Sequence, residues 1–193
     1  GNWNGTHCVG YSEWPGWNYR KSHNILNSTG ADVNYTINIT VINAIGTDSG
    51  NTVYINNKAR SDFGDIRFTN ATGSLLDYWM ENVTNTVNAT FWVEIDGNLT
   101  STNQTIYVYY GKSDATTTSN GDETFDFFDD FSGTLSKWTV ISGTWQIEND
   151  ELSGETNVYG QRIRANNFYF GNHSVRVKIK WISGTYVVHG TYV

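Results

Sequence analysis

The sequence predicts an all-β protein made of two β-sandwich modules, and its composition gives the first reason for this fold class. The strand-favouring residues Val, Ile, Tyr, Phe, Trp and Thr number 82 among 193, whereas the helix-favouring Ala, Leu, Glu and Lys number 26. The second reason is that short apolar or alternating runs recur about every ten residues, separated by clusters of Gly, Asn, Asp and Ser. This spacing is typical of sandwiches and barrels.

Eight segments carry the strand pattern, and they are 33–42, 51–57, 65–70, 89–95, 105–111, 137–142, 144–148 and 174–181. Alternation is clearest in the last segment, where one face is expected to be buried and the other wet. The expected buried residues are Val175, Val177, Ile179 and Trp181, and the wet ones are Arg176, Lys178 and Lys180. We expect a solvated sheet face there rather than a patch for an anionic ligand.

The segment "VNYTINITV" (33–41) combines the same alternation with two Asn-x-Thr triplets. Its apolar positions, expected to face the core, are Val33, Tyr35, Ile37, Ile39 and Val41. The asparagines Asn34 and Asn38 are therefore expected to point away from the core.

Residues 113–124, "SDATTTSNGDET" with no apolar periodicity, are expected to link the two modules. This gives an N-terminal extension (1–16), a first β-sandwich (17–112), a linker (113–124) and a second module (125–193). The chain opens on "GNWNG" without a charged and apolar leader, so any secretion signal is expected to have been removed or to lie outside this sequence. Cys8 is expected to be a free thiol or an intermolecular link.

Five sequence blocks occur in an order that resembles the domain of unknown function 2341 family, a module of bacterial and archaeal surface proteins. The blocks are "WNYRK" (17–21), "DFGDIRFTNATGSLLDYWMEN" (62–82), "FWVEI" (91–95), "IYVYYG" (106–111) and "FDFFDDF" (125–131). The resemblance implies a surface protein and names no reaction.

The segment from 125 onward resembles the start of a concanavalin A-like (laminin G-like) jelly roll, with "DDF" followed by Trp138 and Trp145. Residues 125–193 have room for about six or seven strands, about half of what such a jelly roll needs. We therefore expect either that the chain continues or that a neighbouring subunit completes an incomplete jelly roll. The large rings Trp17, Tyr19, Phe68, Tyr78 and Trp79 are expected to anchor the core rather than to stack on sugar.

No catalytic residue is predicted, and we expect no enzyme. Glycosidases of the jelly-roll fold need paired carboxylates on one strand, but "EIDGNL" (94–99) places Leu99 where the second glutamate would stand. "GTDSG" (46–50) holds Asp48 rather than a serine between its glycines, and the four histidines lack metal-ligand spacing. An alternative is a fragment of a glycoside hydrolase whose catalytic residues lie beyond residue 193.

A net charge of −7 with only 12 Lys and Arg excludes a typical nucleic-acid partner and disfavours an anionic membrane surface. No run of about 20 apolar residues occurs, so no membrane insertion is expected. Acidic residues between 122 and 130 could hold Ca²⁺, although a solvated acidic linker is favoured because the order of a calcium loop is missing. These residues are Asp122, Glu123, Asp126, Asp129 and Asp130, of which the last three are the metal candidates.

Asn-x-Ser/Thr triplets, the acceptor sequons for N-glycosylation, are the strongest functional signal. They occur at Asn4, Asn27, Asn34, Asn38, Asn70, Asn82, Asn88, Asn98, Asn103 and Asn172. Chance predicts about five from this composition, and nine of the ten lie at or before residue 103. We expect several to carry covalent N-glycans.

The expected function is that of a secreted or cell-surface glycoprotein, archaeal in origin, with a structural or adhesive role in a layer, appendage or filament. Self-assembly with neighbouring subunits is expected because the second module is incomplete. The alternative is a carbohydrate-binding adhesin that recognises a glycan ligand through Trp145, Tyr159 or Tyr169.

Overall fold

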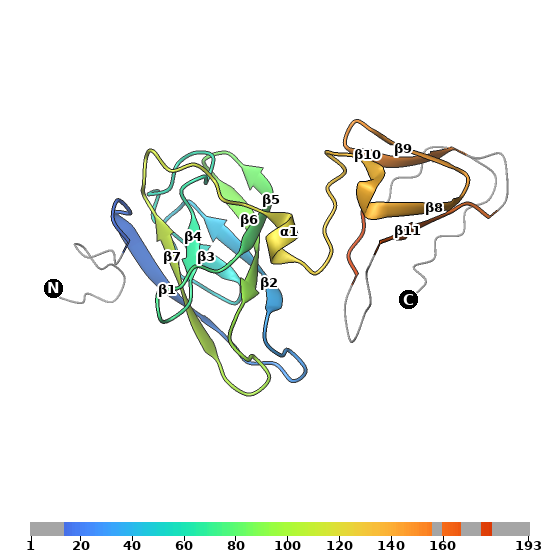
Figure 1. Cartoon of the computed structure of the whole chain (residues 1–193). Coiled ribbons are helices and arrows are strands. Elements are labelled where there is room, and N and C mark those ends of the chain that lie inside the picture. Colours follow the sequence, from blue (N-terminus) through green and yellow to red (C-terminus); the bar gives the residue numbers. More distant parts are fainter. Residues whose placement is uncertain (1–13, 156–159, 167–174, 179–193) are drawn as a thin grey trace, which may run out of the picture. The chain divides into compact units, whose positions relative to one another are not determined.

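The computed structural model describes residues 14–155, 160–166 and 175–178, and it divides the chain into two compact units (Figure 1). The first unit is Gly1–Phe128 and the second is Asp129–Val193. Strands dominate both units, which confirms the prediction of an all-β fold.

The first unit is a sandwich of two sheets. One sheet has the order β1-β7-β4 and is antiparallel throughout. The other has the order β3-β2-β6-β5, in which β3 runs parallel to β2 and the remaining pairs are antiparallel. The strands are β1 (Tyr19–Ile25), β2 (Tyr35–Ile42), β3 (Thr52–Tyr54), β4 (Arg67–Thr69), β5 (Tyr78–Thr84), β6 (Asn88–Ile95) and β7 (Gln104–Tyr110).

Alternate residues of these strands form one core between the sheets. In β6 every second side chain is buried, and these are Ala89, Phe91, Val93 and Ile95. Phe91 also contacts Phe68 and Tyr78 edge-to-face, with ring centroids 5.3 and 5.7 Å apart. These contacts join both sheets through aromatic side chains.

The expectation for residues 33–41 is right at one end of the strand and wrong at the other. Ile39 and Val41 are fully buried, and Ile37 packs against the core. Val33 and Tyr35, expected in the core, are 54% and 49% exposed. The reason is that β2 begins only at Tyr35, after a turn in which Asn34 has a φ of 56°. Both side chains therefore stand at the end of the sandwich rather than between its sheets.

Of the five aromatic residues expected to anchor the core, Phe68 and Tyr78 are buried, as predicted. Trp17, Tyr19 and Trp79 are only half-buried. Trp79 points out of the sandwich, because it alternates with Tyr78 in β5, and its ring lies 5.9 Å from Phe125 and 4.8 Å from Phe128. Sequence pattern alone does not separate the two faces of this short strand.

Residues 113–128 belong to the first unit and pack against its sandwich. The Met80 backbone N–H donates to Ser119 Oγ at 2.7 Å, and Asn120 N–H donates to the Tyr78 carbonyl at 2.9 Å. The short helix α1 (Gly121–Thr124) follows, capped by Asn120, and its Thr124 carbonyl accepts a bond from Thr36 Oγ1. We call residues 113–128 the strap.

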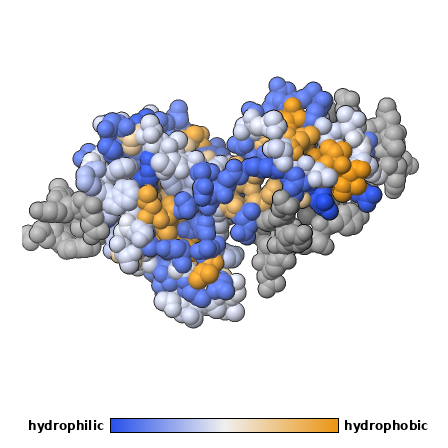
Figure 2. Space-filling model, viewed as in Figure 1, coloured by the Kyte–Doolittle hydropathy of each residue, from blue (hydrophilic) through white to orange (hydrophobic). Residues whose placement is uncertain are grey.

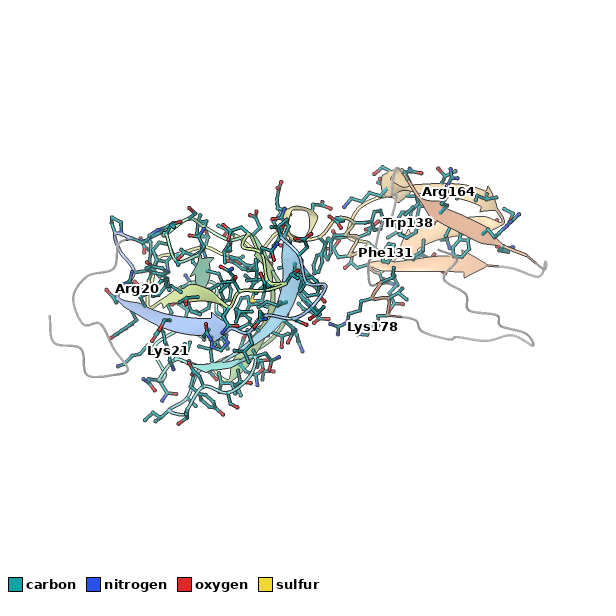
Figure 3. The ribbon with its side chains drawn as sticks, turned by 90° about the horizontal axis from the view of Figure 1, so that it is seen from below. Arg20, Lys21, Phe131, Trp138, Arg164 and Lys178 are labelled. Carbon is teal, nitrogen blue, oxygen red and sulfur yellow. The ribbon has the colours of Figure 1, made fainter. Side chains whose placement is uncertain are left out.

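The described residues of the second unit form two small antiparallel sheets and a 3₁₀ turn, η1 (Leu135–Lys137). β8 (Trp138–Ser142) pairs with β11 (Arg162–Ala165), and β9 (Thr144–Glu148) pairs with β10 (Glu151–Glu155). The predicted strands at 137–142 and 144–148 are thus present. In Figure 3, Trp138 lies beside Phe131, with ring centroids 5.8 Å apart. No residue in the described part of this unit is buried, and Val140 and Ile141 are 43% and 49% exposed.

The strand predicted at 174–181 is not found where the structure describes this segment. Residues 175–178 have no regular secondary structure, and Val175 and Val177 are 48% and 59% exposed. No described strand pairs with them, and alternation without a pairing partner does not hold a strand in place. Residues 179–181 lie outside the described ranges.

Among the described residues, no helix has the length and apolar character needed to cross a membrane.

Candidate functional site

Topology gathers sequons at one end of the first unit. The register places the end of β1 beside the start of β7, the start of β2 beside the end of β6, and the end of β4 beside the first half of β7. The β1–β2, β4–β5 and β6–β7 connections therefore meet, and we call residues 26–34, 70–77 and 96–103 the loop end. Its sequon asparagines are Asn27, Asn34, Asn70, Asn98 and Asn103.

Two of these sequons lie side by side although they are far apart in sequence. The backbone N–H of Asn27 donates to Asn103 Oδ1 at 2.8 Å. Both residues are exposed, as is Asn34 in the turn before β2. The turn positions predicted for Asn70 and Asn98 are also found, with Asn98 exposed and Asn70 half-exposed.

The amides of Asn70 and Asn98 are held by hydrogen bonds within the loop end. Asn70 Nδ2 donates to Asp96 Oδ2 at 2.6 Å, while its Oδ1 accepts from Thr72 and Ser74. Asn98 Nδ2 donates to Asp32 Oδ1 at 2.9 Å, and its Oδ1 accepts from the Thr100 backbone N–H at 2.8 Å. Each amide therefore fixes the shape of a loop.

Three further sequon asparagines lie on the outer face of the four-stranded sheet, and they are Asn38, Asn82 and Asn88. Asn38 alternates with the buried Ile39, so it points outward, as predicted, and its Oδ1 accepts from Asn51 Nδ2 at 3.0 Å. Asn82 sits at a bulge of β5 and pairs with Thr90 on the outer side of β6. Asn4 and Asn172 lie outside the described residues. None of the eight described sequon asparagines is buried.

Trp145, the first of the three candidate sugar platforms, is half-buried within its own hairpin. Its Nε1–H donates to the Ser142 carbonyl at 3.0 Å, and its ring covers Gly154 on the paired strand, where a Cβ would lie 2.8 Å from it. The glycine thus makes room for the indole. Tyr159 and Tyr169 lie outside the described residues.

The three candidate metal ligands, Asp126, Asp129 and Asp130, differ in their hydrogen bonds and exposure. Asp129 accepts from Trp138 Nε1 and from the Phe131 N–H at 2.6 and 2.8 Å. Asp130 accepts from both the hydroxyl and the N–H of Ser132, and these bonds lower the pKa of its carboxyl. Asp126 is exposed. The described residues contain no group of three His, Cys, Asp or Glu side chains placed to hold a metal ion.

A polar cluster at the sandwich edge between β1 and β3 is not evident in the sequence. Lys21 Nζ, visible in Figure 3, lies 2.6 Å from Asp48 Oδ1 and 2.8 Å from the Tyr54 carbonyl. Asp48 Oδ1 also accepts from the Tyr54 N–H at 2.8 Å. Since β1 and β3 belong to different sheets, Lys21 and Asp48 connect the two layers. The only sequence signal is that polar side chains occupy inward positions of β1.

His23 and Tyr110 complete this cluster. Burial lowers the pKa of His23, which is 7% exposed, while attraction to Asp48 opposes the shift. Its Nε2 has no hydrogen-bond partner among the described residues. Burial, and then the charge of Asp48, raises the pKa of Tyr110 to about 12. Lys21 and Asp48 bond to each other and to the Tyr54 backbone, and the cluster contains no pair of carboxylates, so its geometry fits bracing of the edge.

The block "DFGDIRF" (62–68), which leads into β4, forms a network of hydrogen bonds and an ion pair. Asp62 pairs with Arg60 at 2.8 Å and accepts from the Gly64 N–H at 3.1 Å. The buried Asp65 accepts from the backbone N–H groups of Arg60 and Gly111, at 3.0 and 2.7 Å. The buried Arg67 donates to Tyr78 Oη at 3.0 Å. These bonds connect β4 to the chain after β7 and to β5.

Comparison with known proteins gives one match. The model of the family described as Domain of unknown function (DUF2341) matches residues 62–148, a little under half of the chain. The match runs from the segment before β4 to the end of β9, and so includes parts of both units. It confirms the family resemblance over residues 62–131, leaves the block at 17–21 outside the match, and extends over residues 132–148, which were expected to belong to the jelly roll. No curated protein and no solved structure matches the chain.

Proposed function

We propose that the chain is a secreted, N-glycosylated surface protein, with a structural or adhesive role in a cell-surface layer, appendage or filament and no reaction of its own. The observation that carries this proposal is the placement of the sequons. All eight described sequon asparagines are at the surface of the first unit, five at the loop end and three on one sheet face.

Glycans at these positions would suit a protein that lasts on a cell surface. They would hinder proteases at the loop end and oppose unwanted pairing along the part of the β5 edge that does not bond to residues 119–120. They would also crowd any substrate cleft on this side of the unit. A structural or adhesive role is therefore favoured over turnover.

Intact-mass measurement on the natural protein, before and after removal of N-glycans, tests the glycosylation. We expect the mass to decrease by that of several sugar chains, and we expect to find the protein in the cell-surface fraction. An unchanged mass, or a protein found only inside the cell, would contradict the proposal.

The second unit supports assembly as the structural part of this role. In this proposal it is the start of a concanavalin A-like jelly roll, completed by a strand from a neighbouring copy. The supporting observations are that the described strands of this unit form two separate two-stranded sheets and that Val140 and Ile141 on β8 are exposed. Two-stranded sheets alone are marginally stable in water, so added strands would stabilise them.

Sedimentation at rising protein concentration tests the assembly. We expect oligomers that weaken when Val140 and Ile141 are both replaced by Thr. Ile45→Thr, which changes an 82% exposed residue of the first unit, is the control and is expected to leave association unchanged. A compact monomer at every concentration would rule out this part of the proposal.

A further inference from the structure

Exposed apolar side chains on the first unit lie next to sequons. Figure 2 shows apolar residues standing out on a largely hydrophilic surface. The exposed large apolar residues of this unit are Leu26, Val33, Tyr35, Ile45, Leu75, Val83 and Val87. Five of the seven directly adjoin a sequon asparagine in the sequence, the exceptions being Ile45 and Leu75. Val33 and Tyr35 flank the same asparagine, Asn34, so two exposed apolar side chains adjoin one sequon, where a covering group would remove both from water.

The other asparagines of the same unit serve as an internal control. Residues 14–128 hold eight asparagines outside sequons, and these are Asn18, Asn24, Asn43, Asn51, Asn56, Asn57, Asn85 and Asn120. None of them adjoins an exposed large apolar residue, whereas four of the eight sequon asparagines do. The association therefore belongs to the sequons and not to asparagine in general.

The four sequon asparagines that adjoin exposed apolar residues are Asn27, Asn34, Asn82 and Asn88. Their side-chain amides are also available for glycosylation. No Nδ2 among them donates to any described residue, and all four side chains are exposed or half-exposed. Asn70 and Asn98 differ on both counts, since their Nδ2 atoms bond to Asp96 and Asp32 and no exposed large apolar residue adjoins them.

We propose that N-glycans occupy these four asparagines and cover the apolar side chains beside them, whereas Asn70 and Asn98 stay unmodified. This inference rests on the proposed glycosylation and adds which sites are used and what the sugar contacts. A sugar ring has an apolar C–H face, so a ring packed over Leu26 or Tyr35 removes apolar area from water. The glycan would then act as part of the folded surface.

The chemistry requires a sugar activated by a phosphate leaving group. The amide nitrogen Nδ2 bonds to the anomeric carbon, the bond from that carbon to the phosphate oxygen breaks, and the nitrogen loses one proton to water. Asn70 Nδ2 is already donating to a carboxylate 2.6 Å away, and its Oδ1 accepts bonds from residues 72 and 74. Attack from this nitrogen would require opening the loop, which explains why the site is expected to remain empty.

Glycopeptide mapping of the full chain, made in a host that attaches N-glycans, tests site choice. We expect sugar on Asn27, Asn34, Asn82 and Asn88 and none on Asn70 or Asn98. Asp96→Ala is expected to raise occupancy at Asn70, because it frees the amide. Equal occupancy at Asn70 in both proteins would overturn the inference while leaving the proposed function intact, and no sugar at any site would overturn both.

Binding of an apolar fluorescent dye to the glycosylated protein tests the covering role. Asn34→Asp removes one glycan and is expected to raise dye fluorescence about twofold or more, because Val33 and Tyr35 become uncovered. Asn103→Asp removes a sequon that no exposed large apolar residue adjoins in the sequence, adds the same charge, and is expected to change nothing. Adding Val33→Ser and Tyr35→Thr to Asn34→Asp should restore the low signal. Equal responses of the Asn34 and Asn103 variants would overturn the covering role.

Discussion

At the scale of single residues, Lys21 joins the two sheets of the first unit. Its ammonium group contacts a carboxylate and a backbone carbonyl from the opposite sheet layer, and the two charged side chains are only 16% and 21% exposed. A charge pair that is largely withdrawn from water is costly to break on one side, because the remaining charge keeps little hydration.

Lys21→Met tests this link. We expect a loss of about 2 kcal/mol in the free energy of unfolding, because Asp48 loses its charged partner. Denaturant unfolding measures it. Asp114→Asn is the matched control, since Asp114 pairs with Lys112 at the surface and is 78% exposed. An unchanged unfolding midpoint for the Lys21 variant would show that the pair does not brace the edge.

His23 makes the stability of this edge depend on pH. Its folded pKa is lowered below 6.5, chiefly by burial, so the unfolded chain binds a proton more readily than the folded one. The stabilising contribution is present above pH 6.5 and is lost as the pH falls from 6.5 through the folded pKa. Lys21 and Asp48 are the charged groups that act on it.

We therefore expect His23→Gln to flatten the pH dependence of unfolding between pH 7 and the acid range. Thermal unfolding of both proteins across that range measures the effect, and the difference between them removes the shared contribution of the carboxylates. An equal slope in the two proteins would contradict the burial of a neutral imidazole.

At this scale, the sequence predicts the features that depend only on neighbouring residues. The sequons are triplets, so they are visible directly, and their exposure follows from alternation or turn residues. The Lys21–Asp48 pair joins residues 27 positions apart, and its partners come together only when β1 and the β2–β3 connection fold. Nothing in "YRKSHNI" distinguishes an inward lysine from a solvated one.

At the scale of elements, the strap is held by the hydroxyl of Tyr78. Tyr78 Oη lies 3.2 Å from both the N–H and the hydroxyl of Thr118, and it accepts from Arg67 Nη1 at 3.0 Å. One phenol thus connects β4, β5 and the strap.

Tyr78→Phe is expected to lower the free energy of unfolding by about 1–3 kcal/mol, because the buried guanidinium of Arg67 and the N–H and hydroxyl of Thr118 lose an acceptor. We also expect faster proteolysis within residues 113–128. Tyr107→Phe is the control. It also removes a phenol hydroxyl, but it keeps the ring on which Arg20 lies, with Arg20 Cζ 4.5 Å from the ring centroid. Equal protease resistance in the two variants would argue against this role of Tyr78.

The alternation of apolar and polar residues predicts some strands of this protein correctly and others not. It finds β6, which is paired on both sides and alternates along its whole length. It overextends β2 toward Val33, because the pattern continues past the point where the opposite sheet ends. It misses β1, in which the inward-facing Lys21 and His23 are polar, and it predicts a strand at 174–181, where residues 175–178 have no described partner.

At the scale of the whole molecule, the first unit contains a complete core. Every buried residue of its apolar cluster lies between Ile25 and Tyr110, and the strap closes one side of it. The described part of the second unit contains no buried residue. The two units are therefore expected to differ in stability.

We expect residues 14–128 to fold on their own, with a single cooperative unfolding transition close to that of the same unit in the full chain. Scanning calorimetry on both proteins measures this. Limited proteolysis of the full chain is expected to leave a resistant fragment that ends after residue 128. Cleavage inside the first unit before any cleavage beyond 128 would contradict this difference.

The sequence by itself determined the all-β class, most strand positions and the list of sequons, because these depend on composition and on neighbours one to three residues away. Only the tertiary structure decided which ends of strands leave the core, which sequons share the loop end, and which amides are held by carboxylates. The physical reason is that exposure and hydrogen bonding are set by residues distant in the chain. Asn70 and Asn34 are equivalent as triplets, but Asp96 reaches the first and the end of the sandwich leaves the second open.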